Sequence, residues 1–186
     1  LGASDNHRKG FGPFPAGIRH ATYNDLSSVK ALITAKTAAI IIEPVQGEAG
    51  VVPAKQEFLL GVRDLCTQNG VLLIMDEVQS GVGRMGNLFG YKAFGIEPDI
   101  LTSAKGLGGG IPIGATLTKN DIASSMSVGS HGSTFGGNPM ACAVADKVIE
   151  IVSNPNFLQE VKEKETLLVN KLEGVSKKHQ AFREIR

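Results

Sequence analysis

The 186 residues carry a net charge of +1, and 42% of them are hydrophobic while 20% are charged. This length allows one sizeable domain or part of a larger protein. The chain contains neither a long basic run nor an apolar run that could span a bilayer, so we expect neither nucleic acid nor a membrane as a partner.

The chain alternates between strand and helix patterns after a Gly- and Pro-rich segment, residues 1–22, that is typical of a loop. The predicted strands are short and almost wholly apolar; they are Ala38–Ile42, Val71–Met75, Ile100–Ser103 and Ile113–Leu117. The predicted helices have apolar residues at helical spacing; they follow Asn24-Asp25 as a cap, Pro53 in a first turn, Pro139 and Asn156 as a cap. A short helix is also expected near Tyr91–Phe94.

Apolar strands that alternate with helices predict the α/β class, with a mostly parallel sheet and helices on both faces. Ligands of open α/β sheets bind beyond the carboxyl ends of the strands. Glu43, Asp76 and Lys105 each lie just past a predicted strand. If these strands are parallel, the three side chains meet at one edge of the sheet.

An acid and a lysine at neighbouring strand ends suit pyridoxal phosphate, whose aldehyde needs a lysine and whose ring nitrogen needs an acid. In that role Lys105 anchors the cofactor and moves a proton, and Asp76 keeps the ring nitrogen protonated. The alternatives are an ordinary solvated lysine and a helix-capping aspartate. The apolar strand before Lys105 and the glycines after it favour the first interpretation.

The segment Gly81-x-Gly83-x-x-Gly86 matches the dinucleotide-binding pattern in spacing. That motif should follow a strand directly and open a helix, whereas residues 76–80 intervene and no clear helix begins there. A nicotinamide-dependent oxidoreductase therefore stays open as an alternative enzyme, and a non-catalytic fragment that only binds a partner is a third possibility.

Four motifs together resemble the class III (subgroup II) aminotransferases, which are pyridoxal-phosphate enzymes of fold type I. The motifs are Glu43-Pro44-Val45-Gln46-Gly47-Glu48, Asp76-Glu77-Val78-Gln79-Ser80-Gly81, Ser103-Ala104-Lys105-Gly106 and Gly132-Ser133-Thr134-Phe135-Gly136-Gly137-Asn138-Pro139. The flanking sequence is most similar to that of acetylornithine and succinylornithine transaminases. The resemblance runs over essentially the whole chain.

The resemblance implies a role for each matching residue around pyridoxal 5'-phosphate. Lys105 matches the Schiff-base lysine, which makes it the catalytic residue, and Asp76 matches the partner of the ring nitrogen. Val78 matches the residue behind the ring, and Gln79 matches the residue near the phenolic oxygen. No metal site is implied.

Four further residues match positions that concern the neighbouring subunit or the substrate. Thr134, with Ser133 beside it, matches the residue that reaches the phosphate of the other subunit's cofactor, which implies a homodimer with shared active sites. Glu43 matches a carboxylate near the cofactor. Glu48 matches an acid that pairs with an arginine expected beyond Arg186, and this pair switches the pocket between two substrates.

The resemblance implies transfer of the ω-amino group of N-acetylornithine or N-succinylornithine to 2-oxoglutarate, in the biosynthesis or degradation of arginine in the cytoplasm. Ornithine or 4-aminobutyrate aminotransferase is the alternative. Members of the family are about twice as long as this chain, so it corresponds to their central part. Residues 1–152 are then expected to belong to the cofactor-binding large domain, and residues 153–186 to form a linker helix and the start of a small C-terminal domain.

Overall fold

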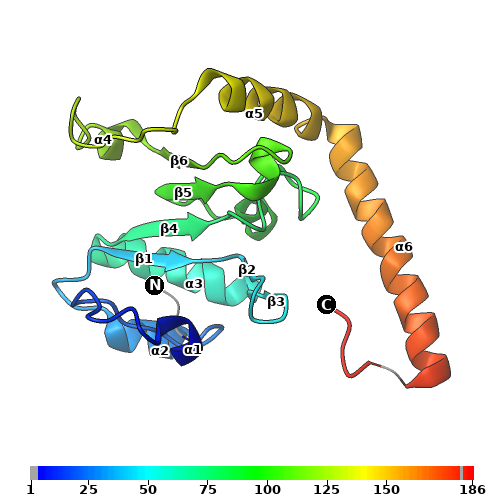
Figure 1. The fold of residues 1–186 in the computed structure, drawn as a ribbon. Coiled ribbons are helices and arrows are strands. Elements are labelled where there is room, and N and C mark those ends of the chain that lie inside the picture. Colours follow the sequence, from blue (N-terminus) through cyan, green and yellow to red (C-terminus); the bar gives the residue numbers. More distant parts are fainter. Residues whose placement is uncertain (1–3, 181) are drawn as a thin grey trace.

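A four-stranded mixed sheet forms the centre of the computed structural model, which describes residues 4–180 and 182–186 (Figure 1). Its strands lie in the order β1 (Ala39–Ile42), β4 (Leu72–Asp76), β5 (Ile100–Ser103) and β6 (Ala115–Thr118). The first three strands are parallel, and β6 runs antiparallel to β5. The expected strand patterns are confirmed, with boundaries displaced by no more than two residues.

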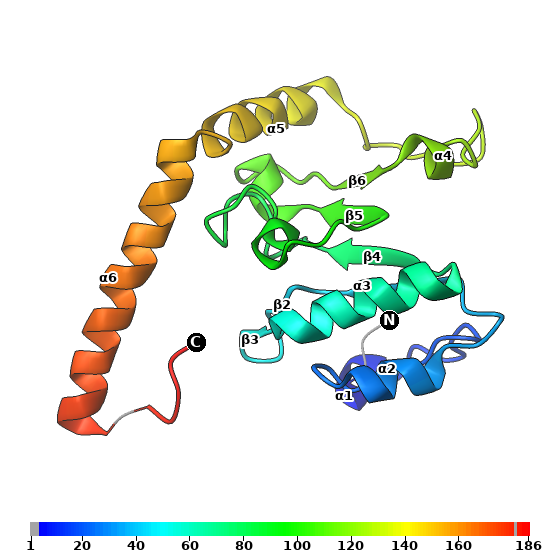
Figure 2. The same ribbon diagram turned by 180° about the vertical axis from the view of Figure 1, so that it is seen from behind.

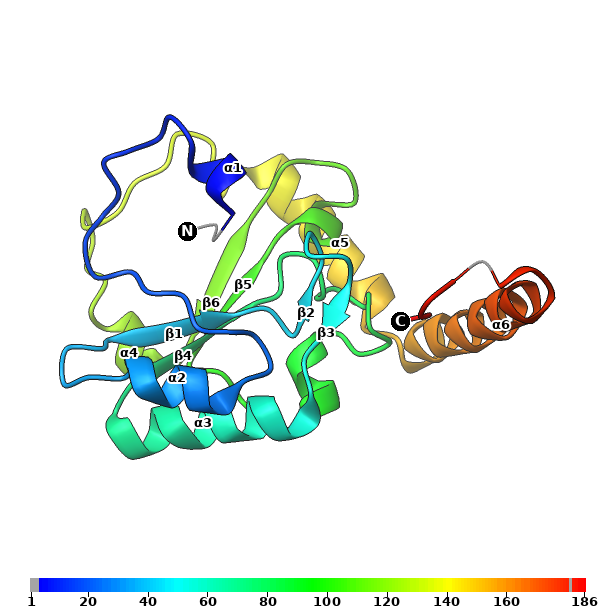
Figure 3. The ribbon, with the colours of Figure 1, turned by 90° about the horizontal axis from the view of Figure 1, so that it is seen from below.

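Helices α2 (Leu26–Leu32) and α3 (Gln56–Asn69) pack on one face of the sheet (Figure 3). The core between them is apolar; its fully buried members include Leu59, Val62, Cys66, Leu73 and Met75. The Asp25 carboxylate caps α2 by accepting hydrogen bonds from the backbone of Ser27 and Ser28. Gly70 ends α3 in the left-handed conformation, as its sequence position predicts.

The opposite face of the sheet is more open than the sequence predicted, and Ile41 of β1 is 48% exposed there. Helix α5 (Pro139–Val152) lies beyond β6 and contacts the 3-10 helix η2 (Lys105–Gly108). Helix α6 (Pro155–His179) then extends away from the sheet (Figures 1 and 2), and none of its residues is buried. The division between residues 152 and 153 into two domains stays a prediction.

Pro53 does not begin a helix, so that prediction is wrong. Pro53 belongs to β3 (Val52–Pro53), which pairs with β2 (Val45–Gln46) in a small antiparallel hairpin. The Pro53 carbonyl accepts a hydrogen bond from the Asn24 side chain at 3.1 Å, and α3 begins only at Gln56. Proline is tolerated both in the first turn of a helix and in an edge strand. Here the pairing of β3 with β2 decides for the strand.

Two smaller predictions also need correction, and one short helix was not predicted. The segment expected to be a loop, residues 1–22, contains the one-turn helix α1 (Asp5–Arg8) among its described residues. Helix α6 is capped by Asn154 rather than Asn156, because the Asn154 side chain accepts the backbone N–H of Asn156. The one-turn helix α4 (Asn120–Ala123) has no apolar period that would predict it.

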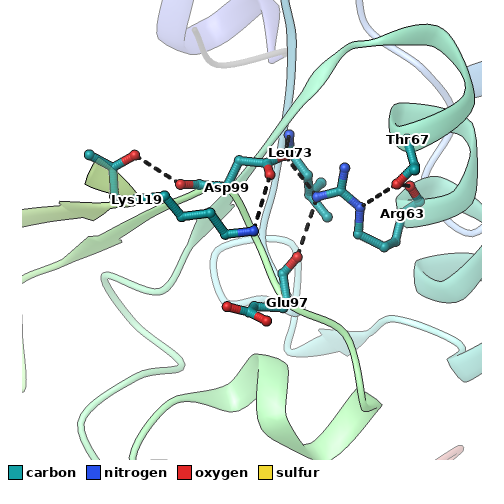
Figure 4. A network of polar contacts seen from close by, with 7 residues as sticks. Arg63, Thr67, Leu73, Glu97, Asp99 and Lys119 are labelled. Atoms are coloured by element: carbon teal, nitrogen blue, oxygen red, sulfur yellow. Dashed lines mark hydrogen bonds and ion pairs between the residues drawn. The ribbon is translucent and has the colours of Figure 1, made fainter. Parts of the chain in front are cut away.

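Asp99 connects α3 with β4 and with the end of β6 at the amino-terminal end of the parallel strands (Figure 4). Its Oδ2 accepts hydrogen bonds from Arg63 Nη1 and from the backbone N–H of Leu73, both at 2.8 Å. Lys119 Nζ lies 3.7 Å from Oδ1, and the Thr118 hydroxyl donates to the Asp99 carbonyl at 2.9 Å. One side chain therefore connects several elements that are distant in sequence.

The pKa of Asp99 lies below its ordinary value. Burial desolvates the carboxylate and raises its pKa, but the hydrogen bonds from Leu73 and Arg63 and the positive charges of Arg63 and Lys119 outweigh that effect. A depressed native pKa stabilises the fold above the unfolded-state pKa, which is about 4 for aspartate, and this stability is lost as the pH falls through the native pKa.

We expect Asp99→Asn to lower the free energy of unfolding at pH 7 by about 2 kcal/mol, because the amide carries no charge and cannot accept from all its donors. Urea unfolding between pH 7 and pH 3 measures this. The difference from the parent should shrink as the pH falls through the native pKa. Asp64→Asn, an exposed change on α3, is the control; equal effects of both variants would contradict this role of Asp99.

Candidate active site

The carboxyl ends of β1, β4 and β5 meet at one edge of the sheet, because these strands are parallel neighbours. Glu43 directly follows β1, Asp76 is the last residue of β4, and Lys105 comes two residues after β5. The geometric expectation from the sequence is therefore confirmed for these three residues. All three are accessible in part, as a site for a small molecule requires.

Asp76 lies on the face of the sheet that faces away from α3. Burial alternates along β4, with Leu73 and Met75 buried and Asp76 half-buried. The Asp76 Oδ1 accepts the backbone N–H of Val78 at 3.0 Å, which orients the carboxylate. Thr102 of β5 is its direct register partner, and the buried Thr102 hydroxyl has no hydrogen-bond partner among the described residues.

Lys105 has a left-handed backbone conformation with φ 46°, which is costly for a residue with a Cβ. Its side chain is exposed at the start of η2. The next residue, Gly106, packs against Val82, since a Cβ at Gly106 would lie 3.5 Å from the Val82 Cβ. Val82 also has a positive φ, 51°. The strained residues Lys105 and Val82 are therefore neighbours through Gly106.

The hairpin of β2 and β3 joins this edge through Gln79. The side-chain amide oxygen of Gln79 lies over Gly47, because a Cβ added at Gly47 would come within 1.4 Å of that oxygen. Gly47 donates its backbone N–H to Glu43 Oε2 at 3.3 Å. Glu48 is exposed on the turn of the same hairpin. The structure therefore brings Glu43, Glu48 and Gln79 together around one glycine.

The C-terminal residues reach the same hairpin from the far end of α6 (Figure 1). Arg186 Nη1 donates to the Gly50 carbonyl at 2.8 Å, and Arg186 Nη2 lies 2.8 Å from the Glu184 carboxylate.

Ser133 and Thr134 belong to a separate segment of the chain and, within the described residues, make no hydrogen bond to Glu43, Asp76 or Lys105. Both are exposed on the segment between α4 and α5 (Figures 1 and 2). The Ser133 hydroxyl accepts the backbone N–H of Gly136 at 2.8 Å, which makes a local turn.

The glycines that match the dinucleotide pattern have a packing role. A Cβ at Gly83 would lie 2.6 Å from Val152 Cγ1, and a Cβ at Gly86 would lie 2.6 Å from Lys162 Cγ. Both glycines have positive φ values, 80° and 69°. Their bare backbones therefore face α5 and α6 rather than a ligand. Only the 3-10 helix η1 (Gly90–Phe94), and no α-helix, follows them before β5, so the geometry disfavours a dinucleotide site.

Two further classes of site find no support in the part of the chain that the structure describes. No group of three or more His, Cys, Asp or Glu side chains could hold a metal ion. No helix is both long and apolar enough to cross a membrane.

Sequence reasoning missed Thr102 and Val82, and it gave Glu77 no role in the site. Glu77 stands next to Asp76 but points into the protein, where it is fully buried. The alternation of side chains along a strand is the signal that separates the two acids. Thr102 could have been found only from the pairing register, and the positive φ of Val82 has no sequence signal because β-branched residues rarely adopt it.

The chain matches known proteins along its whole length. The family model described as aminotransferase class-III matches residues 1–186. Succinylornithine transaminase of Yersinia pseudotuberculosis serotype O:1b (strain IP 31758) is 51% identical over 185 residues, covering 100% of this chain and 45% of that protein. The chain thus spans about half the length of that curated relative.

Solved structures share the fold as well. The crystal structure of N-acetylornithine aminotransferase from Stenotrophomonas maltophilia K279a matches with a TM-score of 0.84 at 36% identity, covering 93% of this chain and 45% of that one. Ornithine aminotransferase from Toxoplasma gondii, crystallised with oxidised glutathione and with partial occupancy of PLP at its active site, matches with a TM-score of 0.89 at 34% identity, covering 99% and 44%.

The expected α/β fold, with its mostly parallel sheet, is thus shared with these aminotransferases, and this chain corresponds to part of their longer chains. With the family model matched from end to end and a relative half identical in sequence, this chain belongs to the class III aminotransferase family.

Proposed function

We propose that the protein containing this chain transfers the ω-amino group of N-acetylornithine or N-succinylornithine to 2-oxoglutarate, with pyridoxal 5'-phosphate as cofactor. The observation that carries the proposal is the acid–lysine pair, Asp76 and Lys105, at the carboxyl ends of the neighbouring parallel strands β4 and β5. Similarity to succinylornithine and N-acetylornithine aminotransferases supports the choice of amino donor. Similarity to ornithine aminotransferase makes ornithine the alternative donor.

The residues at the edge of the sheet fit pyridoxal phosphate chemically. Asp76 offers a carboxylate on the open face, and Thr102 beside it offers a buried hydroxyl with no partner among the described residues. Lys105 offers an exposed amine on a backbone that its neighbours hold in a strained conformation. A primary amine for the aldehyde and an acid for the ring nitrogen are the groups that pyridoxal phosphate needs.

When bound, pyridoxal phosphate supplies an aldehyde that combines with primary amines and a ring that withdraws electrons from the adjoining carbon. Lys105 would be the amine that holds the cofactor and afterwards carries the proton between carbon atoms. Asp76 would keep the proton on the ring nitrogen through a charge-assisted hydrogen bond. Val78 would pack against the ring, and Gln79 would donate to the phenolic oxygen.

The hairpin that carries Glu43 and Glu48 is the proposed substrate side of the site. Glu48 is exposed there, and Glu43 lies nearer the strand end, where its Oε2 accepts the backbone N–H of Gly47. Pairing of Glu48 with an arginine hides the positive charge while the ω-amino donor is bound. Release of that arginine lets it bind a carboxylate of 2-oxoglutarate.

We further infer a cytoplasmic homodimer with shared active sites. Ser133 and Thr134 lie on an exposed segment away from Asp76 and Lys105, and this position suits residues that serve a second subunit. Ser133 and Thr134 of the partner subunit then hold the cofactor phosphate. Phe135, beside them, is 82% exposed, as expected of a side chain that a subunit contact would bury.

We expect Lys105→Ala in the full-length protein to abolish transamination and leave the fold intact, because alanine supplies neither the covalent anchor nor the proton carrier. Turnover, circular dichroism and visible absorbance measure these effects. Borohydride reduction of the parent should attach the cofactor to the peptide that contains Lys105. Lys92→Ala, an exposed change in the helix η1 (Gly90–Phe94), is the control. Turnover of Lys105→Ala near the parent rate would refute the assignment.

Mixing of two inactive variants tests the shared site. In a dimer of Lys105→Ala with the double variant Ser133→Ala/Thr134→Ala, one site carries both defects and the other is whole. Subunit exchange should therefore restore activity to about a quarter of the parent value, since random mixing gives half heterodimers with one good site each. Each variant alone is the control. Verified exchange without recovery of activity would show that Ser133 and Thr134 do not serve the partner's site.

A further inference from the structure

Glu77 is fully buried, at 0% exposure, although a carboxylate is rarely buried unless it is paired. Two backbone N–H groups satisfy it: Tyr91 donates to Oε1 at 2.6 Å and Gly90 donates to Oε2 at 2.5 Å. Both donors belong to the start of η1. Burial raises the pKa of Glu77, and these two hydrogen bonds oppose the rise.

The backbone of Glu77 is fixed as firmly as its side chain. Its N–H donates to the Thr102 carbonyl of β5 at 3.0 Å, which extends the β4–β5 pairing by one residue. Its carbonyl accepts the N–H of Gly81 at 3.0 Å. Glu77 therefore makes four hydrogen bonds, and they connect β5, the glycine-rich loop and η1.

The loop closes on Glu77 without spare room. A Cβ at Gly81 would lie 2.7 Å from the Glu77 carbonyl, and a Cβ at Gly90 would lie 2.6 Å from Met85 Sδ and 3.4 Å from Glu77 Oε2. Because backbone atoms approach the carboxylate so closely, a shift of Glu77 must be passed to its direct neighbours along the chain. Those neighbours are Asp76 and Val78.

We propose that Glu77 is a positioning residue for the cofactor site, whose buried carboxylate fixes the direction in which Asp76 and Val78-Gln79 meet the ring of the cofactor. The inference rests on the proposed pyridoxal-phosphate function. Side chains alternate along β4, so Glu77 anchors the interior while Asp76 faces the open side. The bond from Val78 N to Asp76 Oδ1 spans Glu77, so that the two side chains move with it.

The test uses the full-length protein, stripped of cofactor and titrated with pyridoxal 5'-phosphate. Glu77→Gln keeps the size of the side chain, but its NH₂ group opposes one of the two backbone donors. The dissociation constant of the cofactor should rise by about tenfold, as expected for the loss of one charge-assisted hydrogen bond. The pH titration of the visible absorbance should also shift, because Asp76 no longer meets the ring nitrogen in the parent orientation.

Turnover provides a third readout: kcat should fall by about tenfold, with a KM for the amino donor within about threefold of the parent. Glu97→Gln, which removes an exposed carboxylate nearby, is the matched control and should leave all three quantities at the parent values. A Glu77→Gln protein with lower thermal stability but parent cofactor affinity and parent pH titration would overturn the proposal, because Glu77 would then serve only the fold.

Glu77→Asp provides the second variant if Glu77→Gln does not fold. It retains the charge but is one methylene shorter, so it cannot reach both donors, and an unchanged cofactor dissociation constant would overturn the proposal as well. Failure of the proposed function is distinguishable from failure of this inference. If the proposed function is wrong, the parent protein itself binds no cofactor. If only this inference is wrong, the parent binds the cofactor and the variant binds it with the same dissociation constant.

Discussion

Parallel pairing of β1, β4 and β5 is the constraint on which the rest of the molecule depends. It brings the ends of three strands that are far apart in sequence to one edge of the sheet. Glu43, Asp76 and Lys105 gain their proximity from that pairing alone. Glu43 and Asp76 are half-buried and Lys105 is exposed, so the polar groups at these strand ends stay accessible to water. By contrast, Met75, one residue before Asp76, lies in the apolar core.

The two ends of the sheet differ: the amino-terminal end holds a stabilising polar network, and the carboxyl end holds the residues of the proposed site. At the amino-terminal end, the Asp99 carboxylate accepts hydrogen bonds from Arg63 and Leu73 and lies close to the positive charge of Lys119 (Figure 4). At the carboxyl end, the Thr102 hydroxyl lacks a partner among the described residues and Lys105 has a strained backbone. Unsatisfied and strained groups reduce stability, so their concentration at one end is typical of a functional site.

The neighbouring acids Asp76 and Glu77 show how one strand end serves both purposes. Glu77 turns inward and is enclosed by backbone donors, while Asp76 turns outward to the open face. The glycine-rich loop between them and η1 lets α5 and α6 approach closely. The proposed role of Glu77 thus links the packing of the interior to the orientation of Asp76.

The sequence by itself determined the strands, the α/β class, the helix that Gly70 ends and the positions of Asp76 and Lys105, because burial period and strand-end chemistry are local properties. Only the tertiary structure decided that Pro53 belongs to a hairpin, that Gln79 covers Gly47, that backbone groups of Gly90 and Tyr91 bind the Glu77 carboxylate and that Thr102 faces the same side as Asp76. These features depend on register and on contacts between segments that are distant in sequence. Local propensity carries no information about which distant segment supplies a partner.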